Sequence, residues 1–403
     1  MPPPPTPQWA RFEGAGILDD VRAPYGLGLW IVYRDLLLWA GSERQERTHL
    51  FASPIPDELV AALRAALPST HPPESVARTL TAEPGAGDDA RLLGFCRDVS
   101  DWARDEGFVV IAREFAELVY HLAPNNADSA LFAGRACRQA GAFDRAEQWY
   151  RHAFGLARLH ADHSAYVLAL VRRGVLAEQR GQCEEACRLH TRAWKGAKRH
   201  KLRKLGAYAQ HELLVLGVYT EPLETAQEHA RLALRLYGRF DERFPQLAHD
   251  AAFLWAWHSH FSAALPVFEA VLPFVTRATE RIQVIANIGR AAAAVGDADR
   301  FFRAWDEVNE HKETAAEYRA TALLNLGYGA RTLRRVALSR ELASEALQIA
   351  SLRGESVVAE HAQALVHSLG VTSTLSGDRD QSPTPEMREA AERLIARLRR
   401  NQP

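Results

Sequence analysis

Residues 132–199 read FAGRACRQAGAFDRAEQWYRHAFGLARLHADHSAYVLALVRRGVLAEQRGQCEEACRLHTRAWKGAKR, and this stretch decides the fold. It holds two copies of one spacing, in which a glycine is followed by an alanine, then an aromatic residue or histidine, then a second alanine. The positions are Gly134, Ala146, Tyr150 and Ala153 in the first copy, and Gly174, Ala186, His190 and Ala193 in the second. The copies lie 40 residues apart. A fixed period of this size predicts stacked helix pairs.

The same frame continues on both sides of this stretch. Copies occur at Leu214, Ala226, Ala230 and Ala233; at Ala252, Ala264, Phe268 and Val271; at Gly289, Phe301, Trp305 and Val308; at Gly327, Ser339, Ala343 and Ala346; and upstream at Ser100, Ala112, Ala116 and Val119. Phe301 and Ser339 stand where the other copies have alanine, so the last two copies fit the frame least well. Small residues at these positions let two antiparallel helices approach closely, while the larger ring fills the space beside them.

This pattern resembles that of tetratricopeptide repeat (TPR) proteins. The resemblance covers about two-thirds of the chain and rests on the small residues of both helices, on turn glycines and on a closing proline. The turn and closing residues are Gly107, Gly141, Gly181, Gly296 and Pro124. The resemblance implies an all-α fold: a right-handed superhelical solenoid of antiparallel helix pairs, about seven of them in residues 91–353, with helical N- and C-terminal caps. Spacings of up to 40 residues exceed the usual repeat of about 34, so we expect longer helices or loops.

The N-terminal residues 1–90 do not follow the repeat frame. They begin with the proline-rich stretch Pro2–Pro7, which is expected to be extended or disordered. Helices are predicted at about 25–41, 57–67 and 73–80, separated by prolines and glycines. Apolar side chains cover most of the first helix, so we expect it to be buried against the first repeat as a cap. The alternative is a helix that faces a partner or a membrane.

The C-terminal residues also leave the frame. Residues 354–370 predict one additional helix, and residues 371–385 predict a polar linker. Residues 386–403 form an amphipathic pattern, and this helix either folds back as a cap, which we favour, or docks on a partner.

The composition excludes several classes of protein. A hydrophobic share of 47% and a charged share of 25% are typical of a folded soluble chain. The net charge of −1 gives no overall attraction to nucleic acid or anionic membranes. The N-terminus lacks a signal-peptide pattern, and the most apolar stretch, 27–40, is too short to span a bilayer. Four cysteines are too few for a disulfide framework, so we expect buried reduced thiols and a cytoplasmic protein.

In the TPR family the concave groove is lined mainly by the first helix of each pair. Carried over by the repeat frame, the resemblance implies a groove formed by Arg135, Arg138, Arg172, His211, His249, Asn287, Arg290, Asn325, Tyr328 and Arg331. Asn287 and Asn325 occupy the same slot in successive repeats, where an amide offers a donor and an acceptor to a peptide backbone. The arginines suit bidentate contacts to carboxylates. We therefore predict binding of an extended, acidic segment; the alternative is that these side chains only face solvent.

A second feature is a run of basic residues without an intervening acid. It consists of Arg188, Arg192, Lys195, Lys198, Arg199, Lys201, Arg203 and Lys204. Four of the five lysines of the chain lie in this run. Three interpretations stay open, which are a solvated face, a docking face for an acidic protein, and a surface for nucleic acid. Few aromatic residues are interleaved, which speaks against stacking on bases.

Motifs for chemistry are missing from the sequence. It has no glycine-rich phosphate loop, no nucleophile elbow and no zinc-protease motif. The closest histidine pairs, His160 with His163 and His258 with His260, have no further ligand at a suitable spacing, so neither metal nor cofactor is expected. The leading hypothesis is a non-enzymatic scaffold or adaptor for a protein or peptide. The alternatives are a ligand-responsive sensor, a nucleic-acid-associated factor using residues 188–204, and an enzyme or its accessory subunit.

Overall fold

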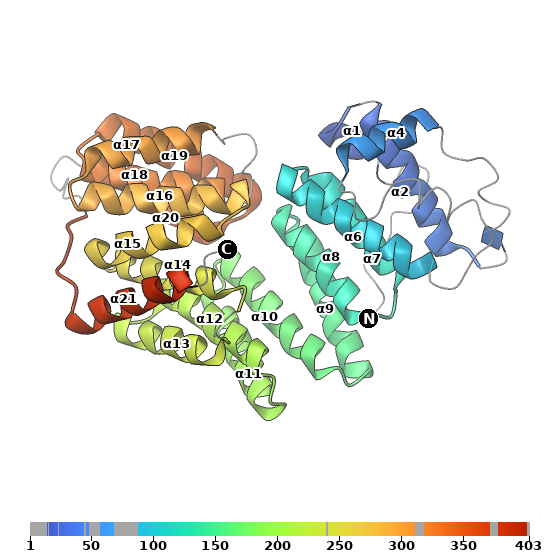
Figure 1. The fold of residues 1–403 in the computed structure, drawn as a ribbon, viewed down its shortest axis with the longest axis horizontal. Coiled ribbons are helices and arrows are strands. Elements are labelled where there is room, and N and C mark those ends of the chain that lie inside the picture. The colour runs from blue at the N-terminus through green and yellow to red at the C-terminus, as the bar shows by residue number, and fades with distance from the viewer. Residues whose placement is uncertain are drawn as a thin grey trace. The chain divides into compact units, whose positions relative to one another are not determined.

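A computed structural model describes residues 14, 16–22, 24–43, 46–47, 57–67, 88–238, 241–310, 318–370 and 378–400 of the chain (Figure 1). The predictions for Pro2–Pro7, for a helix at 73–80 and for the linker residues 371–377 lie outside these residues. The contacts divide the chain into two compact units, residues 1–172 and residues 173–403. The boundary between these units falls inside the run of repeats, within one continuous helix.

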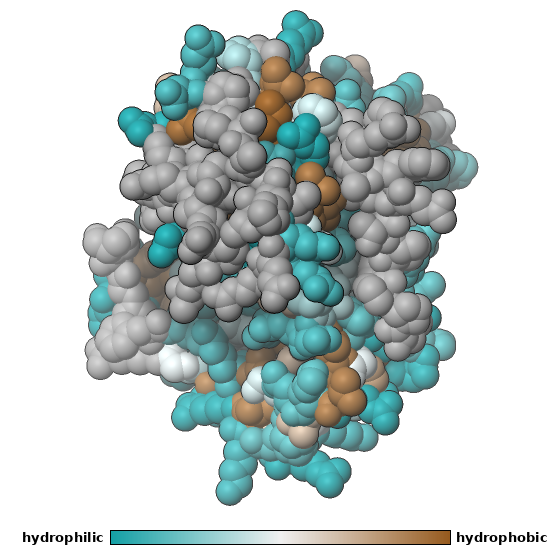
Figure 2. Space-filling view, turned by 90° about the vertical axis from the view of Figure 1, so that its right-hand side faces the viewer, coloured by the Kyte–Doolittle hydropathy of each residue, from teal (hydrophilic) through white to brown (hydrophobic). Residues whose placement is uncertain are grey.

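The first unit consists of helices only in its described residues. They are α1 (Ile17–Asp20), α2 (Tyr25–Gly41), α4 (Asp57–Ala66), α6 (Asp88–Glu106), α7 (Val109–Leu122), α8 (Ala127–Gln139), α9 (Phe143–Leu159) and the start of α10 (His163–Gln179). Helix α2 contacts both α4 and α7, as expected for a helix buried on more than one side. Its Leu29 and Leu36 share a core with Phe115 of α7, and the Tyr33 ring meets Phe115 edge-on at 5.7 Å. On the face shown in Figure 2, hydrophobic residues appear in small groups among hydrophilic ones.

The second unit continues the helix pairs. It contains the rest of α10, then α11 (Cys183–Arg199), α12 (Arg203–Thr220), α13 (Leu223–Leu236), α14 (Phe244–Trp257), α15 (Phe261–Val271), the short 3-10 helix η1 (Leu272–Phe274), α16 (Ala278–Ala294), α17 (Ala298–Glu310), α18 (Arg319–Thr332), α19 (Val336–Arg353), α20 (Ser356–Ser368) and α21 (Pro385–Arg400). Successive helices pack against each other in antiparallel pairs. The predicted fold class, an all-α TPR-like solenoid of helix pairs, is confirmed.

The small residues of the repeat frame lie at the points of closest helix approach. A Cβ atom on Gly134 would lie 2.5 Å from the Tyr150 ring, and one on Gly174 would lie 2.4 Å from the His190 ring. Neither position therefore has room for a side chain. The sequence reasoning about close packing holds at both positions.

The two departures from the frame have local explanations. Ser339 is buried and its hydroxyl donates to the carbonyl of Gly327 at 2.7 Å, which satisfies the polar group inside the helix pair. Phe301 does not face Gly289 closely, because Ala304 takes the near position with a Cβ contact of 3.0 Å. The Phe301 ring instead packs on Gly329, where an added Cβ would lie 2.8 Å away.

Left-handed backbone marks the turns between helices. All four glycines predicted at turns have positive φ, namely Gly107, Gly141, Gly181 and Gly296. Four further turns place a residue with a side chain in the same conformation: Ala161, Lys201, Ser259 and Arg334. The sequence reasoning missed these four turns, because it used glycine as the signal for positive φ.

The last helix folds back onto the array, but at a different place from that expected of an end cap. Helix α21 packs on α15 and α14, and its Met387, Leu394 and Leu398 enter their apolar core. Figure 1 shows α21, in red, beside these two helices. Its apolar stripe is thus covered by the side of the repeat array, because α14 and α15 offer a matching apolar surface there.

The structure also bears on the predictions for the cysteines and for membrane-spanning helices. Cys96 and Cys137 are buried free thiols as predicted, whereas Cys183 and Cys187 of α11 are only half-buried. No helix in the described part of the chain is long and apolar enough to cross a membrane.

Candidate functional site

A cluster of buried polar side chains in the second unit is centred on Arg290 of α16. Its side chain is only 7% exposed, and its guanidinium lies 4.5 Å from the Tyr328 ring and 5.6 Å from the Trp257 ring. A guanidinium over aromatic faces is stabilised by their negative π clouds. These contacts fix the plane of the guanidinium and leave its N–H groups directed toward polar partners.

A carboxylate bridges Arg290 and Arg331. Arg290 Nε and Nη2 both lie 3.1 Å from Oδ2 of Asp378, and Arg331 Nη2 donates to Oδ1 at 3.0 Å. Each oxygen thus faces a different arginine. The Asp378 side chain is 15% exposed, so solvent screens these charge-assisted bonds only partly. Arg331 lies in the last turn of α18, where the helix dipole also favours a cation.

Asp378 belongs to residues 378–384, a non-helical segment that leads into α21 and is here called the strap. The backbone N–H of Asp378 donates to the Thr332 hydroxyl at 3.1 Å, and the N–H of Gln381 donates to the Ser259 carbonyl at 2.8 Å. Asp380 accepts from the backbone N–H of Ser262 at 3.0 Å, in the first turn of α15. The strap therefore reaches from α18 to the turn between α14 and α15, and is held by backbone and carboxylate groups.

Two predicted groove asparagines contribute to this interior, but their amides already have partners. The Asn325 carbonyl oxygen accepts from Arg290 Nη1 at 3.1 Å, and its amide donates to the Thr321 carbonyl at 3.1 Å. The Asn287 amide lies 2.9 Å from His249 Nε2, and its buried oxygen has no hydrogen-bond partner. Both side chains are 3% exposed, so they support the site rather than present open amides.

Behind Asn287 runs a buried chain of hydrogen bonds. His249 Nδ1 lies 2.8 Å from one oxygen of Asp250, and His211 Nε2 lies 2.8 Å from the other. The second nitrogen of His211 meets the Tyr237 hydroxyl at 3.0 Å. Burial alone raises the pKa of Asp250, but the bonds from the two histidines outweigh it and hold that pKa well below its usual range. This network fixes successive first helices of the repeats in register.

Rings from three helices complete the interior. Tyr219 of α12 meets the Trp257 ring edge-on at 4.8 Å, and His361 of α20 lies 5.4 Å from Tyr219 and 5.0 Å from Trp257. Burial raises the pKa of the Tyr219 hydroxyl, and nearby Glu178 adds to the effect. The same burial lowers the pKa of His361, so this ring is neutral at pH 7. The side chains that surround the two arginines in this interior are thus mainly aromatic.

The structure brings seven of the predicted groove residues together in this one unit. They are His211, His249, Asn287, Arg290, Asn325, Tyr328 and Arg331. Sequence reasoning missed Asp378, Trp257 and His361. Their only sequence signals are an acid in a polar linker and aromatic residues at helix positions, neither of which indicates that they meet.

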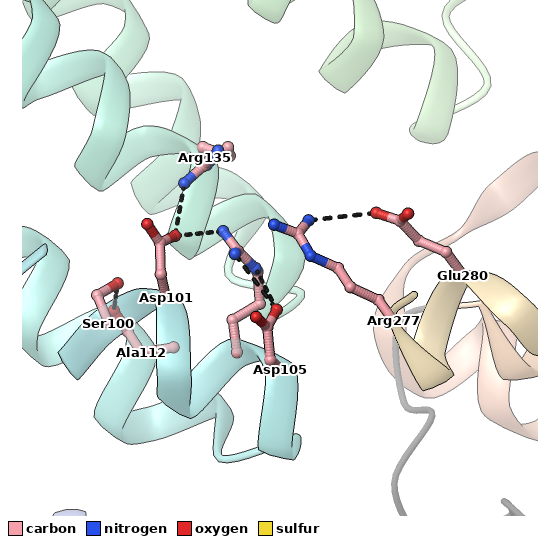
Figure 3. A network of polar contacts seen from close by, with 8 residues as sticks. Ser100, Asp101, Asp105, Ala112, Arg135, Arg277 and Glu280 are labelled. Carbon is pink, nitrogen blue, oxygen red and sulfur yellow. Dashed lines mark hydrogen bonds and ion pairs between the residues drawn. The ribbon is translucent and has the colours of Figure 1, made fainter. Parts of the chain in front are cut away.

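The other three predicted groove residues belong to the first unit. Arg135 forms an ion pair with Asp101 at 3.0 Å, and its guanidinium lies 5.0 Å from the Phe132 ring. Figure 3 shows the Arg135–Asp101 contact, together with the buried bond from the Ser100 hydroxyl to the Ala112 carbonyl. Arg138 is buried and Arg172 is half-buried, and both take part in further interactions. Within this unit Arg135 thus has an internal counter-ion.

The basic run lies on α11 and the start of α12, and all eight of its charged side chains are exposed. Several have partners within the chain: Arg188 pairs with Glu185, Lys204 with Glu242 at 3.1 Å, and Lys198 lies over the Trp194 ring. Arg203 donates to two backbone carbonyls at the end of α13. The run is therefore a real exposed basic face, although part of its charge is matched locally.

The helix pairing and the small-residue contacts define the chain as an all-α repeat protein of the TPR-like class. No family model and no curated protein sequence matches it. Among solved structures it is similar to a Rap protein complexed with competence and sporulation factor, with 12% identity and a TM-score of 0.48, over 83% of this chain and 98% of that one. It is also similar to a STAND protein, a signal transduction ATPase with numerous domains, that has a tetratricopeptide repeat sensor and comes from Pyrococcus horikoshii. That match has 11% identity and a TM-score of 0.47, over 97% of this chain and 66% of that one. Neither similarity assigns a ligand or an activity to this chain.

Proposed function

We propose that this protein is a non-enzymatic, cytoplasmic scaffold that binds a protein or peptide through the interior of residues 173–403. The bound segment is non-helical and acidic, and one of its carboxylates lies between Arg290 and Arg331. The observation that supports this proposal is the strap itself. A short segment of chain is held there by backbone hydrogen bonds and by one carboxylate on two arginines.

The chemistry of the surface favours a carboxylate over other anions and over neutral groups. Two guanidinium groups at about 3 Å from separate oxygens match the planar, two-oxygen shape of a carboxylate. The Tyr328 and Trp257 rings beside Arg290 suit a ligand that also contributes apolar contacts. Backbone groups such as the Ser259 carbonyl give affinity for any main chain, so specificity comes from the acid.

A peptide with the strap's own sequence tests the proposal directly. The probe is the labelled nonapeptide SGDRDQSPT, residues 376–384, added to the full-length Asp378→Asn chain and followed by fluorescence anisotropy. We expect saturable binding that is at least about tenfold weaker when the first aspartate of the peptide is replaced by asparagine. Arg331→Gln should weaken binding similarly, whereas Arg334→Gln, an exposed arginine three residues further on, should not. Equal binding of the acidic and neutral peptides would rule out recognition of a carboxylate.

The basic face supports a second candidate, an association with nucleic acid. Its specific observation is the exposure of Lys195, Arg199 and Lys201 on one side of α11 and its following turn. Phosphate binding of this kind weakens steeply with salt. A titration of a labelled duplex at increasing salt decides the matter, because binding that is absent at low salt removes this candidate.

A further inference from the structure

The strap occupies the position that a ligand carboxylate needs. Arg290 and Arg331 have the same carboxylate as partner, and Arg290 is almost fully buried. Two guanidinium groups held this close require a nearby anion, since removing one would leave buried positive charge without compensation. Asp378 supplies that anion from within the chain. A ligand acid can therefore bind only by replacing it.

The strap is also built so that it can leave without loss of the surrounding fold. Its contacts are polar. Asp378 reaches the buried arginine with a side chain that is 15% exposed, whereas the residues that follow it, Arg379 and Asp380, are exposed. The helix that follows is anchored separately, because Leu394 and Leu398 of α21 are buried against α14 and α15. Polar, exposed contacts belong to the low-stability part of a protein, which opens before its apolar core.

We propose that residues 378–384 are a resident competitor, and that an acidic segment from a partner binds by displacing Asp378 and releasing the strap. This inference rests on the proposed function and adds its regulation. The exchange is neutral in charge, since one carboxylate replaces another between the same two arginines. Helix α21 stays docked during the exchange and keeps the strap tethered beside the site. Release of the strap also breaks the hydrogen bond from the Ser262 N–H to the Asp380 carboxylate. The first turn of α15 therefore differs between the strap-bound and the ligand-bound protein.

The attachment of the strap to the docked helix α21 determines how strongly the strap competes with a ligand. A segment attached close to its site competes at an effective concentration in the millimolar range. A ligand must overcome this internal competition, so its apparent affinity for the wild-type chain is lower than its affinity for the open site. Asparagine at position 378 keeps the size of the side chain but removes the charge, and the strap then competes poorly. We expect the nonapeptide probe to bind Asp378→Asn at least about tenfold more tightly than the wild type.

The experiment compares three full-length chains: the wild type, Asp378→Asn, and Asp306→Asn as the control. Asp306 is exposed on α17, so the control makes the same change of charge elsewhere in the unit. Binding is measured by anisotropy with SGDRDQSPT, and opening of the strap by hydrogen exchange of the amides of residues 378–384. The Gln381 N–H is the informative amide, because it is bonded to the Ser259 carbonyl only while the strap is closed.

The expected result has two parts. Asp378→Asn binds the probe at least about tenfold more tightly than the wild type and the control, and saturating probe accelerates exchange in the strap of the wild type. Equal affinity of the three chains, with exchange unchanged by the probe, overturns the strap inference while leaving peptide binding intact. Absence of binding to every chain, including Asp378→Asn, overturns the proposed function and the strap inference together.

Discussion

Replacement of His190 by phenylalanine should make the protein less sensitive to acid. The His190 ring is fully buried in α11, and neither of its nitrogens has a hydrogen-bond partner. It lies against Gly174, in the slot where Tyr150 lies against Gly134 in the preceding repeat, at nearly the same distance. Because that slot accepts a six-membered ring, phenylalanine is expected to fit at position 190 with little rearrangement.

The size of the effect follows from the pKa of the ring. Burial disfavours the charged imidazolium and lowers the pKa of His190 from 6.5 to about 4, although nearby Glu212 acts weakly in the opposite direction. In the unfolded chain the pKa stays near 6.5. Between these values the unfolded state binds a proton that the folded state does not, so stability falls as the pH falls. Lowering the pH from 7.5 to 5.0 should therefore cost the wild type about 2 kcal/mol through this one residue.

Urea unfolding at pH 7.5, 6.5, 5.5 and 5.0 measures this contribution. The free energy of unfolding of His190→Phe should exceed that of the wild type by about 2 kcal/mol more at pH 5.0 than at pH 7.5. The same substitution at His367, which is exposed in α20, serves as the control and should leave the pH dependence of the wild type unchanged. Parallel pH profiles for the wild type and His190→Phe would refute the reasoning, because the buried ring would then not be the group that resists protonation.

Three further predictions concern other parts of the fold. Gly134→Ala places a Cβ 2.5 Å from a buried ring and should lower the free energy of unfolding, typically by about 1–3 kcal/mol. Gly155→Ala is the matched control, because Gly155 in α9 has open space around it, and it should raise the free energy of unfolding by up to about 1 kcal/mol. Arg334→Gly should stabilise the protein by about 1 kcal/mol, because this turn residue has φ of 59°, and a lower denaturation midpoint would contradict the assignment of strain there. Glu117→Gln should cost about 1–3 kcal/mol in thermal or urea unfolding, because the buried carboxylate accepts hydrogen bonds from Arg145 and Trp149. The Arg145 side chain that loses its counter-ion is 35% exposed, so solvent limits the cost, and no measurable cost would show that this pair contributes little.

The basic run on α11 and the start of α12 shows what sequence spacing predicts about surface charge and what it leaves open. Residues such as Lys195 and Arg199 were grouped by sequence because no acid interrupts them, and the structure does place them on one exposed side of α11. Other charges of the run have partners within the chain: Arg188 pairs with Glu185 of the same helix, and Lys204 pairs with Glu242 in the loop before α14. These pairs reduce the free charge. Sequence spacing thus predicts which charges are exposed, but not how many of them are already matched.

The sequence by itself determined the repeat architecture, and the reason is that its pattern acts over short distances. Gly134 meets Tyr150 because both lie in one helix pair joined by a short turn, so fixed spacing is enough to place them in contact. The same holds for the glycines in the turns. Non-glycine turns such as that at Arg334 escaped prediction, because the array imposes the left-handed backbone there in spite of the residue type.

Only the tertiary structure decided the content of the site. The sequence predicted that Arg290 and Arg331 line one groove, but Asp378 meets them across 88 and 47 residues, from a linker whose path no local pattern records. The docking of α21 on α14 and α15 sets that path, since its apolar stripe could have been covered at several places on the array. Likewise the two asparagines were placed on the correct helices, yet their hydrogen-bond partners depend on which neighbouring side chains reach them in space. The polar cluster around Arg290 thus forms because packing brings distant segments together, which residue spacing alone does not record.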